Sequence, residues 1–183
     1  TASINNYETH RQAAIAATEA VAVEIRRLIA ECGKAIGIFS GERVIGFHTF
    51  ELLGAEEDAP NSQRKFLLDH LVCKVPMAEF HALRGEATNP EAVCANYAEL
   101  LKTRPPDFAV LTVGQSGELA ALGSGDCDWH DSAAVKLTDS AISLTIPTLM
   151  ACSSLFVLME TQTENLLASI LRTHPNAHFY GVR

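Results

Sequence analysis

Short apolar segments alternate along this chain with segments of helical periodicity, and this alternation predicts an α/β fold. The clearest helix start is Asn89-Pro90-Glu91, where a capping side chain, a first-turn proline and an early acid occur together. The clearest strand is the apolar run Phe108–Val113. We therefore expect residues 1–183 to form a single three-layer domain, with a Rossmann-like, largely parallel sheet flanked by helices.

The remaining elements follow in chain order from the same two signals. Residues 7–32 should form one amphipathic helix, because Ile15, Ala22, Ile25 and Ile29 recur at helical spacing. Further helices are expected at 62–72, 90–102 and 161–174, where apolar residues also follow a helical period. Short apolar runs predict strands at 35–39, 44–47, 108–113, 133–137, 141–146, 155–159 and 178–182.

The connection between the first two expected strands is too short for a usual parallel crossover. Only the four residues Ser40–Arg43 separate them, whereas such a crossover takes a dozen or more residues. If the chain is continuous, the strands should pair antiparallel through a tight turn, or one of them should leave the sheet. If they run parallel, residues are missing at Gly41–Glu42, and the Cα separation there will exceed about 3.8 Å.

Composition narrows the classes of partner and location. Hydrophobic residues make up 48% of the chain and charged residues 20%, which is typical of a globular protein. The formal net charge of −8 argues against nucleic acid or an anionic membrane as a partner. The five cysteines are scattered without a C-x-x-C pair, and residues 1–10 lack the apolar stretch of a signal peptide. We expect a cytoplasmic protein with reduced thiols, no metal site and no cofactor.

Several segments occur in an order that resembles one known family. Ala35–Gly41 is similar to its first strand, which enters a Ser-Gly-Gly-Ser-Thr-Pro loop, and Val44–Glu51 to its second strand, which ends in Asp-Glu. Asp107–Gly114 is similar to its Asp-Leu-x-Leu-Leu-Gly-x-Gly strand, and Gln115–Ala120 stands where it has Asn/Pro-Asp-Gly-His-x-Ala. Ile142–Pro147 is similar to its Ile-Thr-Leu-Thr-x-Pro segment. This order resembles the family of glucosamine-6-phosphate deaminases and 6-phosphogluconolactonases.

The resemblance implies a ligand site at the carboxyl ends of the strands. In that family the loop after the first strand holds the sugar phosphate, with backbone N–H groups and hydroxyls as donors. We expect His48 on the wall of the same pocket rather than in catalysis. The positions that the resemblance and this expectation assign to ligand binding are Ser40, Gly41, His48, Gly114, Gln115, Ser116 and Gly117.

Most positions that carry the family's chemistry are replaced. The base of the deaminases falls on Phe50, the histidine of Asp-Gly-His falls on Glu118, and the phosphate-binding lysine falls on Thr163. Glu160 occupies a family glycine position, and the phosphate loop stops after Ser40-Gly41. The resemblance therefore implies a reaction that is weakened or lost, leaving a sugar-binding or assembly role.

The alternative is an active enzyme on a different sugar-like substrate, with Glu118 and Glu51 as acid and base. It requires both carboxylates to face one cavity within about 10 Å. A simpler reading of Glu118 is an acid in the first turn of a helix, where the helix dipole favours it. Under either hypothesis the expected partner is a small sugar or sugar phosphate, and the sequence leaves homo-oligomer formation open.

Overall fold

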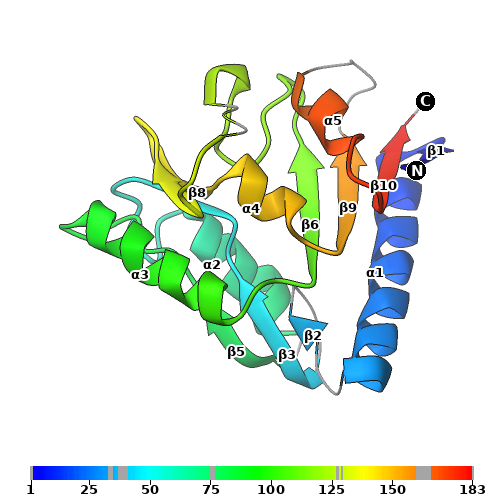
Figure 1. The fold of residues 1–183 in the computed structure, drawn as a ribbon, viewed down its shortest axis with the longest axis horizontal. Helices are drawn as coiled ribbons and strands as arrows, with labels where there is room; N and C mark the ends of the chain where they lie inside the picture. Colours follow the sequence, from blue (N-terminus) through cyan, green and yellow to red (C-terminus); the bar gives the residue numbers. More distant parts are fainter. Residues whose placement is uncertain are drawn as a thin grey trace.

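The computed structural model describes residues 2–32, 35–36, 41–74, 77–126, 128, 130–159 and 166–182 (Figure 1). Strands and helices alternate through most of this chain. In order they are β1 (Ser3–Tyr7), α1 (His10–Cys32), β2 (Ala35–Ile36), β3 (Gly41–Phe47), β4 (Phe50–Leu52), α2 (Gln63–Leu67), the π-helical turn η1 (Leu68–Val72), β5 (Met77–His81), α3 (Pro90–Thr103), β6 (Phe108–Val113), the 3₁₀ turn η2 (Ser124–Asp126), β7 (Val135–Leu137), β8 (Ala141–Leu144), α4 (Ile146–Met150), β9 (Ser154–Met159), α5 (Leu166–Leu171) and β10 (Ala177–Val182).

The described strands form three groups, two of them parallel. A four-stranded parallel sheet has the order β1-β10-β9-β6, and β2-β3-β5 form a second parallel sheet. The third sheet, β4-β8-β7, is antiparallel. The predicted α/β class with a largely parallel sheet is therefore confirmed.

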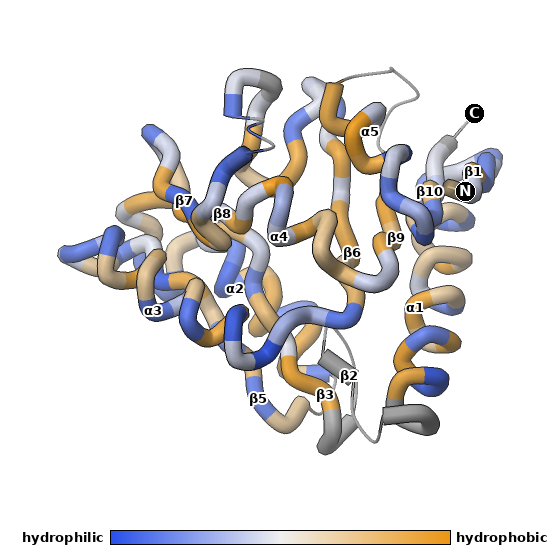
Figure 2. The backbone as a smooth tube through the Cα atoms, viewed as in Figure 1, coloured by the Kyte–Doolittle hydropathy of each residue, from blue (hydrophilic) through white to orange (hydrophobic). Residues whose placement is uncertain are grey.

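Helices cover both faces of the four-stranded sheet, which gives the predicted three layers (Figure 1). On one face, Phe108 of β6 and Phe156 of β9 pack with the apolar side of α1. On the other face, Leu111 and Val157 pack in a second cluster with residues of α4 and α5. Figure 2 shows the apolar character concentrated in β6 and β9, between these helices. None of the helices in the described ranges is both long and apolar enough to cross a membrane.

The two helices with clear sequence signals begin where those signals predict. Asn89 caps α3, because its side chain accepts a hydrogen bond of 2.9 Å from the Ala92 N–H. Ser62 caps α2 in the same way through Lys65, at 3.1 Å. The helical region predicted at 62–72 continues from α2 into η1.

Tyr97 of α3 connects the end of β3 with the end of β5. Its ring packs edge-on against Phe47, and its hydroxyl lies 2.9 Å from the carbonyl oxygens of both His48 and His81. Burial raises the pKa of the Tyr97 hydroxyl well above its ordinary value, so this group stays a donor. α3 thereby fixes the point where the chain leaves β3.

Several elements were not predicted, or were predicted with different bounds. The strand β1 is not predicted by its polar sequence, and the helix expected from Tyr7 begins at His10. β1 pairs with β10 from the other end of the chain, so its strand conformation depends on a distant partner. The sequence also does not predict the three-residue strand β4, the strand β5 or the short helix α4. Ile146 begins α4 instead of ending a strand.

The prediction of an antiparallel connection between the first two strands is wrong. β2 pairs with β3 in parallel, with Ala35 opposite Val44 and Ile36 opposite Ile45, and Gly41 and Glu42 are consecutive in β3. Residues 37–40, which connect the two strands, lie outside the described part of the chain.

Gly85 packs directly against β4, and we predict that one added methyl group at this position lowers the stability of the fold. A Cβ at Gly85 would overlap the Leu52 carbonyl oxygen and lie 3.0 Å from Glu51 Cγ. We expect Gly85→Ala to lower the free energy of unfolding by about 3 kcal/mol, because backbone cannot yield as a side chain can. Urea denaturation measures the change. Gly125→Ala is the control, since nothing lies within 4 Å of a Cβ there; equal effects of the two variants would contradict the prediction.

Candidate functional site

A hollow of about 300 Å³ opens beside the carboxyl end of β6. We call it the β6 hollow. It lies where ligands bind in open α/β sheets, outside the carboxyl ends of parallel strands. Its walls consist of His48–Phe50 after β3, Gln63, Phe66 and Leu67 of α2, Val110–Thr112 of β6, and Gly114, Glu118 and Ala120 of the following turn.

The turn after β6 places the Glu118 carboxylate at this hollow. The Gly114 N–H donates to the Glu118 carbonyl at 2.9 Å, and the Gly117 N–H donates to the Gly114 carbonyl at 3.0 Å. Gly117 has a φ of 83°, which favours glycine. A Cβ on Gly114 would overlap Glu118 Oε1, so the missing side chain makes room for the carboxylate. Glu118 is exposed at the hollow rather than placed in the first turn of a helix.

The other predicted residues of the turn are spread over a wider surface. Gln115 lines a second hollow of about 460 Å³ together with His10, and Thr112 contributes to both hollows. Ser116 is exposed at the tip of the turn. Gly41 begins β3 at the end opposite to His48. Ser40, Glu160 and Thr163 fall outside the described residues, so their predicted roles stay predictions.

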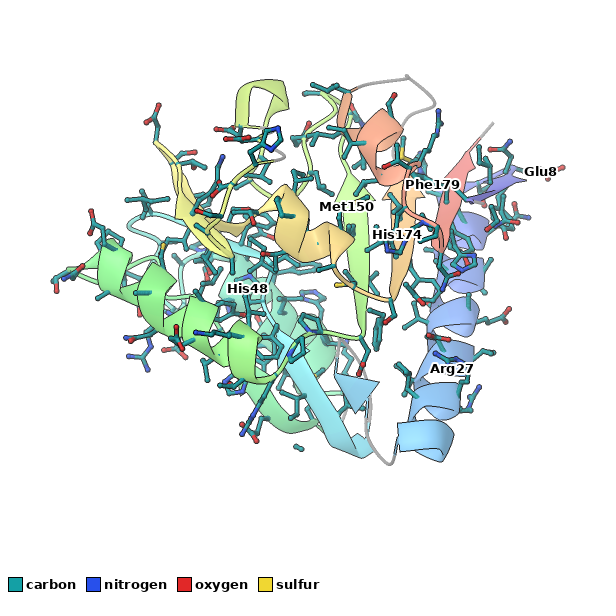
Figure 3. The ribbon with its side chains drawn as sticks, in the orientation of Figure 1. Glu8, Arg27, His48, Met150, His174 and Phe179 are labelled. Carbon is teal, nitrogen blue, oxygen red and sulfur yellow. The ribbon has the colours of Figure 1, made fainter. Side chains whose placement is uncertain are left out.

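His48 forms part of the wall, as the sequence predicts, and it is almost fully buried (Figure 3). Neither ring nitrogen has a hydrogen-bond partner among the described residues. Burial lowers the pKa of His48 from 6.5 to about 4, with a contribution from Arg64 and against an opposing effect of Glu51. The ring is therefore neutral at pH 7, and its two nitrogens are buried away from the open hollow.

Glu51 holds the start of α2 instead of facing the hollow. Its buried Oε1 accepts hydrogen bonds from the N–H groups of Leu52 and Gln63, at 2.9 and 3.0 Å. Its Oε2 accepts from the Ser62 hydroxyl at 2.9 Å and from the Arg64 N–H at 2.7 Å. A carboxylate that accepts unpaired N–H groups of a first helical turn stabilises that turn.

Glu51 and Glu118 do not converge on one cavity, as the alternative of an active enzyme requires. Successive side chains of a strand point to opposite faces, so Phe50 of β4 faces the hollow while Glu51 faces α2. The sequence analysis also missed Gln63, Phe66 and Thr112 as wall residues. The only signal for the first two is the Ser62 cap, which fixes the start of their helix.

Arg64 is a second buried charge that the sequence analysis did not single out. It is 5% exposed, and its guanidinium lies 3.2 Å from Glu86 and 3.9 Å from Glu57. Together with Glu51 it joins α2 to β4 and to the loop that contains Gly85. In the described ranges, no three His, Cys, Asp or Glu side chains gather closely enough to hold a metal ion.

Chemically, the β6 hollow combines apolar surface with a few polar groups. Phe50 and Phe66 contribute rings, while Gln63, Thr112 and neutral His48 contribute uncharged donors and acceptors. Glu118 contributes the only carboxylate among the described residues of the wall. Such a surface can bind hydroxyl groups and stack against an apolar ring face.

Comparison with curated proteins finds sequence relatives over part of this chain, and no family model matches it. Glucosamine-6-phosphate deaminase of Listeria monocytogenes is 36% identical over 90 residues, which cover 49% of this chain and 38% of the enzyme. The corresponding enzyme of Lactobacillus helveticus is 29% identical over 102 residues, covering 54% of this chain and 41% of the enzyme. The matches thus span about two fifths of the length of these relatives.

Comparison with solved structures finds the same fold over nearly the whole chain. A monomeric glucosamine-6-phosphate deaminase superposes with a TM-score of 0.80 at 16% identity, covering 99% of this chain and 97% of the other. 6-Phosphogluconolactonase from Trypanosoma brucei superposes with a TM-score of 0.79 at 14% identity, covering 100% and 96%. At these identities the likeness establishes the fold.

The structural role of Glu51 leads to a stability prediction. Glu51→Gln keeps the size of the side chain. It places an NH₂ group opposite donors that face a carboxylate oxygen in the natural protein. We expect the free energy of unfolding to fall by about 3 kcal/mol or more, since hydrogen bonds to charged groups contribute about 1.5–3 kcal/mol each. Urea denaturation measures this, with the exposed Glu56→Gln as the matched control. If both variants change the free energy of unfolding by less than about 0.5 kcal/mol, Glu51 does not have this structural role.

His48 leads to a prediction about pH. Its pKa is about 4 in the folded protein and 6.5 without burial, so between these values the unfolded chain binds more protons. Stability linked to His48 is complete above pH 6.5 and falls as the pH drops towards 4, by about 3 kcal/mol in total. Unfolding free energies at pH 7, 6 and 5 should fall more steeply for the natural protein than for His48→Gln. Parallel pH profiles would show that His48 is not held neutral by the fold.

Proposed function

We propose that this chain, which belongs to the family of glucosamine-6-phosphate deaminases and 6-phosphogluconolactonases, binds a small sugar-like ligand in the β6 hollow. Its role lies in carbohydrate metabolism, with the family's reaction weakened or lost. The observation that carries this proposal is the position of Phe50, whose ring lines the hollow where the resemblance places the catalytic base. A cytoplasmic location and a single domain over residues 1–183 are parts of the same proposal.

The wall of the hollow offers little for acid–base chemistry. A phenyl ring can neither accept nor donate a proton, and Glu51 is occupied by α2. His48, with a pKa of about 4, is a weak base at neutral pH. Glu118 therefore remains as one carboxylate without the second group that an acid–base pair requires, which also argues against the rival enzyme with Glu118 and Glu51.

The same wall is suited to holding a monosaccharide. The hollow of about 300 Å³ lies at the lower end of the usual range for ligand pockets. Phe50 and Phe66 can pack against the apolar face of a sugar ring, while Gln63 and Thr112 can bind its hydroxyl groups. His48 contributes to the wall as a buried, neutral ring, and adds no charge to the hollow.

The loss of the family reaction is tested by assaying the purified protein with glucosamine 6-phosphate and 6-phosphogluconolactone. We expect no turnover above background, because missing general acid–base groups alone remove a factor of about 10²–10⁴. A deaminase and a lactonase of known activity, assayed in parallel, serve as controls for the substrates. Turnover in the ordinary enzyme range of about 1–10³ s⁻¹ with either substrate would refute the proposal.

A further inference from the structure

The charges around the β6 hollow point to a ligand class different from the phosphorylated sugars named for its relatives. Among the described residues that line it, Glu118 is the only acidic side chain, and burial lowers the pKa of His48 to about 4. None of these described wall residues is a lysine or an arginine. The adjoining hollow at His10 and Gln115 is likewise lined without a lysine or arginine.

A phosphate group fits poorly against such a wall. It carries a charge of about −1.5 to −2 at pH 7 and is usually held by arginine, lysine or backbone N–H groups at a helix start. The N–H groups at the start of α2, the helix that forms one side of the hollow, already donate to Glu51. Glu118 adds repulsion, which is strongest in a partly enclosed site where water screens less.

We infer that the β6 hollow selects an unphosphorylated, amine-bearing sugar or a similar polyhydroxy amine. The inference rests on the proposed function and specifies its ligand class. The ammonium group pairs with the Glu118 carboxylate, the strongest hydrogen-bonding combination that this wall offers. The rings of Phe50 and Phe66 add the apolar contact and favour a cation near their faces.

Gly114 provides a way to move this carboxylate without removing it. An alanine side chain at Gly114 would overlap Glu118 Oε1, the far end of a flexible side chain that can rotate away. The backbone of Gly114 does not have the positive φ that would strain an alanine. Gly114→Ala should therefore keep stability while displacing the Glu118 carboxylate from its place at the hollow.

The test compares three sugars by calorimetry or ligand-observed NMR: glucosamine, its neutral counterpart glucose, and glucosamine 6-phosphate. For the natural protein we expect glucosamine to bind about 10-fold more tightly than glucosamine 6-phosphate and several-fold more tightly than glucose. A single ion pair at a partly exposed site supports preferences of this size. The preference for glucosamine over glucose should shrink as salt is raised, because ions screen the pair.

Variants assign the preference to particular side chains. Glu118→Gln and Gly114→Ala should both abolish the preference for glucosamine over glucose while leaving glucose binding in place. Glu56→Gln removes one exposed acid outside the hollow and should leave the preference unchanged. Gln63→Trp places a large ring in the β6 hollow alone and should abolish binding of all three sugars, which locates the site.

The possible outcomes distinguish a failure of this inference from a failure of the proposed function. If glucosamine 6-phosphate binds as tightly as glucosamine, or if Glu118→Gln keeps the preference, the inference is wrong and the sugar site stands. If none of the three sugars binds, the proposed function fails and the inference fails with it. If Gln63→Trp leaves binding intact, the sugar site lies elsewhere and Glu118 does not select the ligand.

Discussion

The buried carboxylate of Glu51 holds β4 against the start of α2, and the shape of the β6 hollow depends on this junction. Four donors surround the two oxygens, three of them backbone N–H groups. A buried carboxylate without such partners would cost several kcal/mol, so β4 and α2 must come together for either to be stable. Once α2 is fixed, Phe66 and Leu67 form one side of the hollow, while Gly85 packs against the Leu52 carbonyl and the Glu51 side chain.

Support of the fold and access to the ligand are divided between neighbouring residues of β4. Because side chains alternate along a strand, Glu51 faces α2 and Phe50 faces the hollow. The side chain at position 50 can therefore set the chemistry of the hollow without disturbing the Glu51 junction. The presence of an acid at position 51 is explained by the fold and does not by itself indicate a reaction.

Elements governed by neighbouring residues could be predicted from the sequence, and elements governed by distant partners could not. α3 was predicted because Asn89 and Pro90 fix its first turn locally, and β6 because its apolar run is long and unbroken. β1 is polar and becomes a strand only by pairing with β10. The parallel pairing of β2 and β3 was not predicted, because the four residues between the expected strands are fewer than a parallel crossover usually takes.

In the candidate site, too, features set by neighbouring residues could be predicted, and those set by distant partners could not. The wall position of His48 could be predicted from its place just after a strand. That its ring nitrogens have no hydrogen-bond partner among the described residues could not be predicted. The donors to Glu51 come from residues 52 and 62–64, so its structural role becomes visible only when α2 folds back on β4. Glu118 has the same sequence context whether it begins a helix or lies over Gly114, and only the second arrangement brings its charge to the hollow. The electrostatic character of the site is thus set by which few charges the fold brings within a Debye length of about 8 Å, and not by the net charge of the chain.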